Sequence, residues 1–261
     1  MYKPGLMQGE RILVTGGGTG LGRVMTEAFL LLGAQVCDIR RHEAITDMLD
    51  GIWMHGGALT GLVNNAAGNF ISRTEDLSPR AFDAIANIVF RGSFYITLDC
   101  GKRWLAEGRK ASVLSILTTW VWNGSAFTVP SAMSKAGLNA MTQSLAVEWA
   151  GRGVRLNAIA PGLFPTEGMS ARLNPGGGEH TDERNPMGRH GRMPELANLA
   201  VFLMSRQAEW VNGQTIAIDG AGYQAHGGNF ARLLAWGDDD WTRARESIEK
   251  TNAKDRAQRS V

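Results

Sequence analysis

A glycine-rich stretch near the start of the chain limits the possible folds most strongly. The run TGGGTGLG (15–22) follows a short β-rich segment (11–15) and opens a segment with apolar residues at helical spacing (22–34). Glycines in this place allow a tight turn, a close approach of a pyrophosphate to the backbone and a close helix–strand contact. The helix N-terminus then offers free N–H groups to phosphates. The stretch therefore predicts a dinucleotide site between a first strand and a first helix.

Short apolar segments alternate with segments of helical periodicity along the rest of the chain. The alternation predicts an α/β, Rossmann-like, doubly wound parallel sheet with helices on both faces. Ser78 is predicted to cap one long helix, with Pro79 at its first position. The later strands are expected within 35–39, 59–68, 111–116, 154–162 and 213–220, and the helices within 22–34, 43–54, 78–108, 131–153 and 194–205.

Length and composition exclude several classes of protein. A chain of 261 residues is long enough for one large α/β domain, and 44% hydrophobic with 20% charged residues is typical of a globular protein. The net charge of +2 gives no reason to expect a nucleic acid or an anionic membrane as partner. Two cysteines make no disulfide framework, so a cytoplasmic location is expected. No metal site is expected.

Five motifs occur in a fixed order along the chain. They are TGGGTGLG (15–22), NNAAG (64–68), a Lys on the long helix at 135, NAIAPG (157–162) and IDG (218–220). Together they resemble the short-chain dehydrogenase/reductase family over nearly the whole chain. The resemblance implies one Rossmann-fold domain over 1–261, with a substrate lid at 163–193 and a C-terminal extension at 223–261.

Longer segments are similar to one branch of that family, the 2,4-dienoyl-CoA reductases. They are NNAAGNFIS (64–72), GSAFTVPSAMSKAG (124–137), AVEWAGRGVRLNAIAPG (146–162), ELANLAVFL (195–203) and the tail at 227–250. The resemblance implies an NADP-dependent enzyme, with NAD as an alternative cofactor, that acts on a small-molecule acyl thioester. It also implies a homotetramer formed through long helices.

Ser131 stands four residues before Lys135, where the most familiar family members have a Tyr. In the dienoyl-CoA branch a Ser is expected there, and the Lys holds the nicotinamide ribose. Positions i and i+4 share one helix face, so both side chains can point into one site. The alternative is that Ser131 caps the helix and Lys135 is solvated.

Trp120 stands fifteen residues before Lys135, where the branch has its catalytic Tyr. The chain has three Tyr, and none lies near this point of the sequence. An indole N–H donates a hydrogen bond but cannot supply a proton near neutral pH. Trp120 and Trp122 are therefore either donors or a wall of an apolar pocket. Thr118 matches the catalytic Ser of mainstream members or simply ends a strand, and Val89 replaces the Asn that those members carry.

The resemblance also implies the chemistry and its residues. Hydride addition to a dienoyl thioester moves negative charge to the thioester oxygen, and Asn69 is the expected hydrogen-bond donor to that oxygen. Phe70 and Ser78 match positions that contact the acyl-CoA. Residues expected to contact the cofactor are Gly16, Gly18, Thr19, Gly20, Leu21, Gly22, Asn65, Ala66, Lys135, Pro161, Gly162, Leu163 and Phe164.

The segment between Gly33 and Asn64 is too short for the two strand–helix units of the family. We therefore expect about six strands, one fewer than in the family. In one alignment the second unit is missing, Asp38 contacts the adenine and Arg40 contacts the substrate. In the other, Arg40 and Arg41 bind the 2′-phosphate of NADPH, unless both are merely solvated charges. These departures favour an alternative function: a binding or regulatory protein, or a non-redox enzyme, on the same fold.

Overall fold

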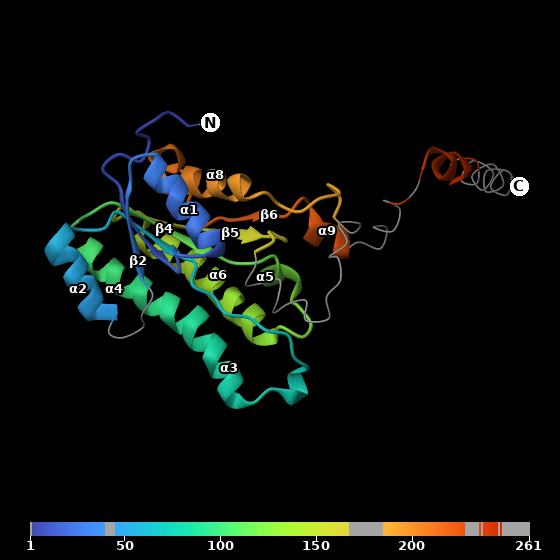
Figure 1. Ribbon diagram of the computed structural model, residues 1–261, viewed down its shortest axis with the longest axis horizontal. Coiled ribbons are helices and arrows are strands. Elements are labelled where there is room, and N and C mark those ends of the chain that lie inside the picture. Colours follow the sequence, from blue (N-terminus) through green and yellow to red (C-terminus); the bar gives the residue numbers. More distant parts are fainter. Residues whose placement is uncertain are drawn as a thin grey trace, which may run out of the picture. The chain divides into compact units, whose positions relative to one another are not determined.

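In the computed structural model, six parallel strands form one sheet in the order β2–β1–β3–β4–β5–β6. Figure 1 shows the sheet with its surrounding helices. The fold class and the number of strands predicted from the sequence are confirmed. Residues 2–39, 45–166, 185–227, 235, 237–244 and 246 are described. The strands are β1 (Arg11–Thr15), β2 (Gln35–Ile39), β3 (Gly61–Asn64), β4 (Ala111–Ile116), β5 (Val154–Pro161) and β6 (Thr215–Ile218).

Helices cover both faces of the sheet (Figure 1). The helices α1 (Gly20–Leu31) and α8 (Met193–Met204) pack on one face. On the other face lie α2 (Ile45–Gly56), α4 (Ser93–Ala106) and α6 (Val129–Ala150). The alternation of strand side chains explains the two cores, because Val14 of β1 lies in the first and Leu13 in the second.

One predicted helix has an internal irregularity. Its first part, α3 (Pro79–Ala86), begins after Ser78, whose Oγ accepts a 3.2 Å hydrogen bond from the Ala81 N–H, so the predicted cap is confirmed. A π-helical segment, η2 (Asn87–Gly92), joins α3 to α4. The remaining short elements are η1 (Thr74–Asp76), α5 (Trp120–Asn123), η4 (Arg206–Ala208) and α9 (Gly222–Gly227).

A single strand and a single helix lie between α1 and β3 in the described part of the chain. The strand, β2, pairs directly with β1, and the helix, α2, packs against α4 on the opposite face from α1. Arg103 of α4 joins Asp50 and Asp99, at 2.8 and 2.9 Å, and lies over the Trp53 ring. Three residues expected to contact the nucleotide or the substrate follow or end β2. The backbone of Asp38 is described, whereas Arg40 and Arg41 lie outside the described residues.

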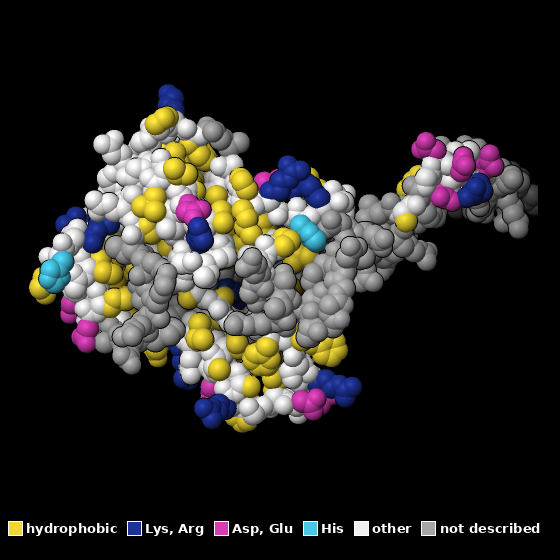
Figure 2. Space-filling view, viewed as in Figure 1, with side chains coloured by type: hydrophobic (Ala, Val, Ile, Leu, Met, Phe, Trp, Pro, Cys, Tyr) yellow, Lys and Arg dark blue, Asp and Glu magenta, His cyan; other side chains and the backbone are white. Residues whose placement is uncertain are grey.

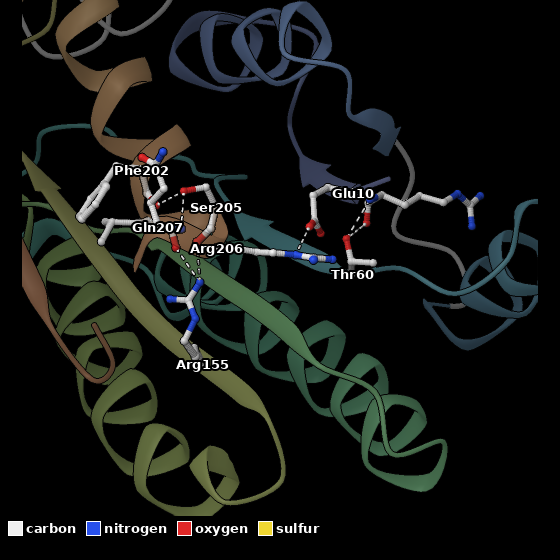
Figure 3. A network of polar contacts seen from close by, with 9 residues as sticks. Glu10, Thr60, Arg155, Phe202, Ser205, Arg206 and Gln207 are labelled. Atoms are coloured by element: carbon white, nitrogen blue, oxygen red, sulfur yellow. Dashed lines mark hydrogen bonds and ion pairs between the residues drawn. The ribbon is translucent and has the colours of Figure 1, made fainter. Parts of the chain in front are cut away.

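A polar network at the amino edge of the sheet fastens α8 to the strands (Figure 3). Arg155, near the start of β5, donates to the carbonyls of Leu203 and Ser205 at the end of α8, at 3.1 and 3.2 Å. Arg206 then pairs with Glu10 just before β1, at 3.5 Å. These groups satisfy carbonyls at a helix C-terminus, so we assign them a structural role.

The first of two compact units, Met1–Tyr223, contains the whole sheet, and Gln224–Val261 forms the second. The predictions of one domain over 1–261, of a lid at 163–193 and of a C-terminal extension at 223–261 stay predictions. No helix among the described residues is long and apolar enough to cross a membrane.

Candidate functional site

The expected site residues gather at the carboxyl ends of the strands. The glycine loop follows β1, the Asn65 segment follows β3, Thr118 follows β4 and Pro161 ends β5. In parallel α/β sheets this edge is where ligands bind, at the point where the strand order reverses. Here β2 and β3 flank β1 on opposite sides, so that point lies at the glycine loop.

The glycine loop is held in shape by the segment after β3. The Thr15 hydroxyl accepts from the backbone N–H groups of Asn65 and Ala66, both at 2.9 Å. The Asn65 amide donates in return to the carbonyls of Thr15 and Gly16, at 3.0 and 3.2 Å. Two of the cofactor candidates thus support the loop instead of only lining it. The sequence did not single out Thr15.

The loop geometry suits a phosphate. Gly16 and Gly20 have φ values of +66° and +52°, which disfavour other residues. Thr19 is the N-cap of α1 without a side-chain hydrogen bond, Leu21 lies in the first turn, and no acidic residue stands in that turn. The α1 N–H groups are therefore not already taken by a capping side chain, as an anion site requires. Gly18 lies between these points and is half-buried.

Gly22→Ala should weaken cofactor binding at least tenfold and cost about 1–3 kcal/mol of stability, as overpacking does. The added Cβ would overlap the Gly16 carbonyl oxygen and lie 2.5 Å from Asn65 Nδ2. Calorimetric titration with NADPH and urea unfolding measure the two effects. Gly51→Ala is the matched control, since a Cβ at Gly51 meets nothing within 4 Å. Equal binding by both variants would contradict the assignment of the loop.

Ser131 and Lys135 lie on the buried face of α6. Their exposed fractions are 5% and 6%, and the Lys135 ammonium donates to the carbonyl of Ile116 at the end of β4. The helix begins at Val129 with Thr128 as its N-cap. The alternative of a capping Ser131 and a solvated Lys135 is therefore wrong. Both residues are buried and stand four positions apart on one helix; that they share one site stays a prediction.

Burial lowers the pKa of Lys135 from 10.5 to about 8. Moving an ammonium out of water raises its free energy, which disfavours the charged form. Among the described residues, the partner of the Lys135 ammonium is a carbonyl and not a carboxylate. A cation held in this way retains hydrogen-bonding capacity for a ligand. This is the property that a group binding ribose hydroxyls needs.

Asn69 and Phe70 follow the Asn65 segment. The side-chain oxygen of Asn69 accepts from the Phe70 N–H at 2.9 Å, which leaves the Nδ2 group as the donor for a ligand. Phe70 is half-buried and packs on a small apolar cluster with Ile85 and Val89. Ser78 is exposed, and its hydroxyl already caps α3. The structure thus gives Ser78 a helix-capping role.

The segment between β4 and α6 contains Thr118 and Trp120. Val89 packs in a cluster with residues of α6. Thr118 and Trp120 are both half-buried, and Trp120 begins α5. Val89 is fully buried in the π-helical segment, within the apolar cluster. An apolar side chain there cannot take part in the polar relay that an Asn would join.

The segment after β5 is fixed by the turn after β6. The Gly162 N–H donates to the Ile218 carbonyl at 3.1 Å, and a Cβ at Gly162 would lie 2.6 Å from that of Asp219. Phe164 is buried, whereas Leu163 is exposed. A cavity of about 240 Å³ lies beside this turn. Its lining includes Leu163, Phe164, Asn185, Arg189, Glu195 and Asp219.

The structure places a tyrosine beside Trp122. Tyr223 stacks on Trp122, with ring centroids 4.7 Å apart and an interplanar angle of 23°. The sequence prediction that no Tyr lies near Trp120 along the chain stands, and this contact is made by Trp122, two residues further on. One hundred residues lie between Trp122 and Tyr223 in the sequence, and no local sequence pattern predicts a contact between them. The Asp219 of the IDG motif was the only available signal, because it leads into this turn.

Exposed hydrophobic side chains gather over the region where Figure 1 places α3, α5 and α6 (Figure 2). The large exposed hydrophobic side chains of α5, α6 and the loop between them include Trp122, Phe127 and Met133, with 42%, 60% and 57% exposed. Other apolar residues of α6 belong to the core of the protomer: Leu138, Met141 and Trp149 are buried, and Leu145 is half-buried. The expected homotetramer stays a prediction.

Comparisons with known proteins agree with this arrangement. The sequence profile of the enoyl-(acyl carrier protein) reductase family matches residues 21–224. A Caenorhabditis elegans protein described as a probable 2,4-dienoyl-CoA reductase is 36% identical over 98% of this chain and 95% of its own. A Bacillus subtilis protein described in the same way is 32% identical over 82% of this chain and 96% of its own.

Solved structures share the fold. A crystal structure described as a 2-deoxy-D-gluconate 3-dehydrogenase from Agrobacterium tumefaciens, with bound NADP, has a TM-score of 0.74 and 30% identity. It covers 85% of this chain and 100% of its own. The chain belongs to the short-chain dehydrogenase/reductase family and lies close to the dienoyl-CoA reductases within it. It is an oxidoreductase, and the neighbour with bound NADP supports a nicotinamide cofactor.

The alignments also measure what the chain lacks. The Caenorhabditis elegans alignment spans 295 residues, of which 98% of a 261-residue chain supplies only about 256, so about 39 residues of the relative have no counterpart. The Bacillus subtilis alignment spans 245 residues, of which 82% of the chain supplies about 214, a deficit of about 31. Both deficits equal roughly one strand–helix unit. They agree with the six-stranded sheet.

Proposed function

We propose that the chain is an NADPH-dependent reductase of 2,4-dienoyl-CoA or a related enoyl thioester. The observation that carries the proposal is the orientation of Asn69. Its side-chain oxygen is occupied by the Phe70 N–H, so its Nδ2 group is the end available to a substrate oxygen. A fixed donor of this kind stabilises the negative charge that a thioester oxygen gains during reduction.

The other predicted site residues would bind the cofactor and orient it. The glycine loop and the α1 N-terminus would hold the pyrophosphate, and Lys135 would hold the nicotinamide ribose. Pro161, Gly162 and Leu163 would present their backbone to the nicotinamide, which supplies hydride when bound. Trp120 donates at most a hydrogen bond, so the dienolate oxygen stays unprotonated during hydride transfer.

A calorimetric titration of nucleotide-free protein with NADPH and with NADH tests the cofactor first. We expect NADPH to bind with a Kd on the order of micromolar and more tightly than NADH. Consumption of NADPH with a 2,4-dienoyl-CoA then tests the reaction. A well-folded protein that binds neither nucleotide would overturn the proposal.

A second candidate is a binding protein or a non-redox enzyme on the same fold. The deficit of about 31–39 residues against its relatives favours it, since one strand–helix unit of a Rossmann fold helps to bind the adenosine half. Acyl-CoA binding without nucleotide binding would be its signature. The cytoplasmic location and the homotetramer remain predictions under either candidate, and light scattering measures the latter.

A further inference from the structure

The stacked pair of Trp122 and Tyr223 joins the segment after β4 to the segment after β6. Trp122 belongs to α5, two positions after the Trp that replaces the expected catalytic Tyr. Tyr223 belongs to α9, which follows β6. The ring centroids lie 4.7 Å apart with an interplanar angle of 23°, a stacked arrangement. The contact therefore connects the entrance of α6 with the turn beside Gly162.

Tyr223 is fixed from its backbone. Asp219 accepts from the N–H groups of Ala221 and Tyr223 through its two carboxylate oxygens, at 3.0 and 2.8 Å. The carbonyl of Asp219 accepts from the Asn185 amide at 2.8 Å. Ala221 has a φ of +65°, a conformation that such a tight turn requires. The turn thus sets the position of the ring independently of its hydroxyl.

The Tyr223 hydroxyl has no hydrogen-bond partner among the described residues. The ring is half-buried, and the Trp122 ring is 42% exposed beside it. The exposed parts of the two ring faces offer aromatic surface to a ligand. Such a surface favours the apolar chain of an acyl thioester over the phosphorylated end of CoA.

We propose that Trp122 and Tyr223 form the wall that meets the acyl chain and limits its length. The inference rests on the proposed function, because it assigns the acyl end of the same site. A substrate whose thioester oxygen lies at Asn69 would extend past Trp120 toward this pair. A chain that is too long would have to displace one of the stacked rings.

The test compares variants across a series of 2,4-dienoyl-CoA substrates from short to long chains. Tyr223→Ala and Trp122→Ala each remove one ring, and we expect KM for the long chains to fall roughly tenfold, a typical effect of pocket size. Tyr223→Phe keeps the ring and should restore the chain-length preference of the wild type. Trp210→Ala is the matched control, since Trp210 is fully exposed.

Three results would overturn the proposal that Trp122 and Tyr223 limit the length of the acyl chain. One is an unchanged chain-length profile in both alanine variants. Another is a fall in kcat at constant KM in Tyr223→Phe, which would make the hydroxyl a participant in the chemistry. The third is the same change in Trp210→Ala. Circular dichroism and NADPH titration establish that each variant is folded. Because there are two alanine variants, the test can still be made if one of them misfolds.

The reductase proposal can be wrong while the proposal for the acyl-chain wall is right, and the two cases can be distinguished. If the wild type reduces no dienoyl-CoA, saturated acyl-CoAs of increasing length serve as probes in calorimetric titrations. Tighter binding of long chains to Tyr223→Ala, but not to Tyr223→Phe, would then support the wall without the reaction. Absence of acyl-CoA binding to any variant would overturn both proposals.

Discussion

Trp120→Tyr is expected to raise kcat for dienoyl-CoA reduction by about 10²-fold, the usual effect of one oxyanion donor. Under the proposed function, position 120 corresponds to a Tyr of the dienoyl-CoA reductases, whose phenol would donate a stronger hydrogen bond to the developing oxyanion than an indole does. The other proposed donor is the Nδ2 group of Asn69, whose side-chain oxygen accepts from the Phe70 N–H. Turnover of NADPH with saturating dienoyl-CoA measures the gain.

Trp210→Tyr is the matched control for this gain, because it makes the same substitution at a fully exposed position. It should not raise kcat. Trp120→Phe removes the indole N–H and shows whether that group donates at all. An inert but folded Trp120→Tyr would weigh against the reductase and favour a binding or non-redox function.

Lys135→Met is expected to abolish NADPH binding and, at pH 7, to stabilise the protein by on the order of 3 kcal/mol. The pKa of Lys135 is lowered by burial from 10.5 to about 8, and each pKa unit corresponds to about 1.4 kcal/mol. At pH 7 the wild type holds a charged ammonium in its interior, and the variant does not. Urea unfolding and NADPH titration measure the two effects.

The pH dependence gives the sign of this effect. Between about pH 8 and 10.5 the unfolded chain binds more protons at Lys135 than the folded protein does, so wild-type stability rises with pH there. The advantage of Lys135→Met should therefore shrink toward pH 10.5. Lys102→Met, at an exposed position of α4, should show no such trend. A constant advantage at all pH values would mean that packing, not charge, stabilises the variant.

Much of the fold could be predicted because its signals are local. The glycine loop between a strand and a helix, the Ser78 cap and the number of strands depend on residue types at short spacing, and all are present. The π-helical segment was not predicted, because its residues have the periodicity of an ordinary helix over this length. Only packing against α6, where Phe90 meets Gly137, distinguishes it.

The candidate site could be predicted in part. Spacing on one helix is enough to place Ser131 and Lys135 on one face. Spacing does not show that this face is buried, nor that Thr15 and Asn65 fasten two loops to each other. Asp38, Arg40 and Arg41 keep their alternative assignments, because the contacts that would decide between them lie outside the described residues and side chains.

The sequence by itself determined the family, the parallel sheet and the shortage of one strand–helix unit, since each follows from the order and spacing of motifs. Only the tertiary structure decided that Lys135 is a buried cation and that Tyr223 lies against Trp122. The physical reason is that desolvation and ring stacking depend on which distant segments meet. For Tyr223, that meeting is set by a turn after the last strand, one hundred residues from its partner.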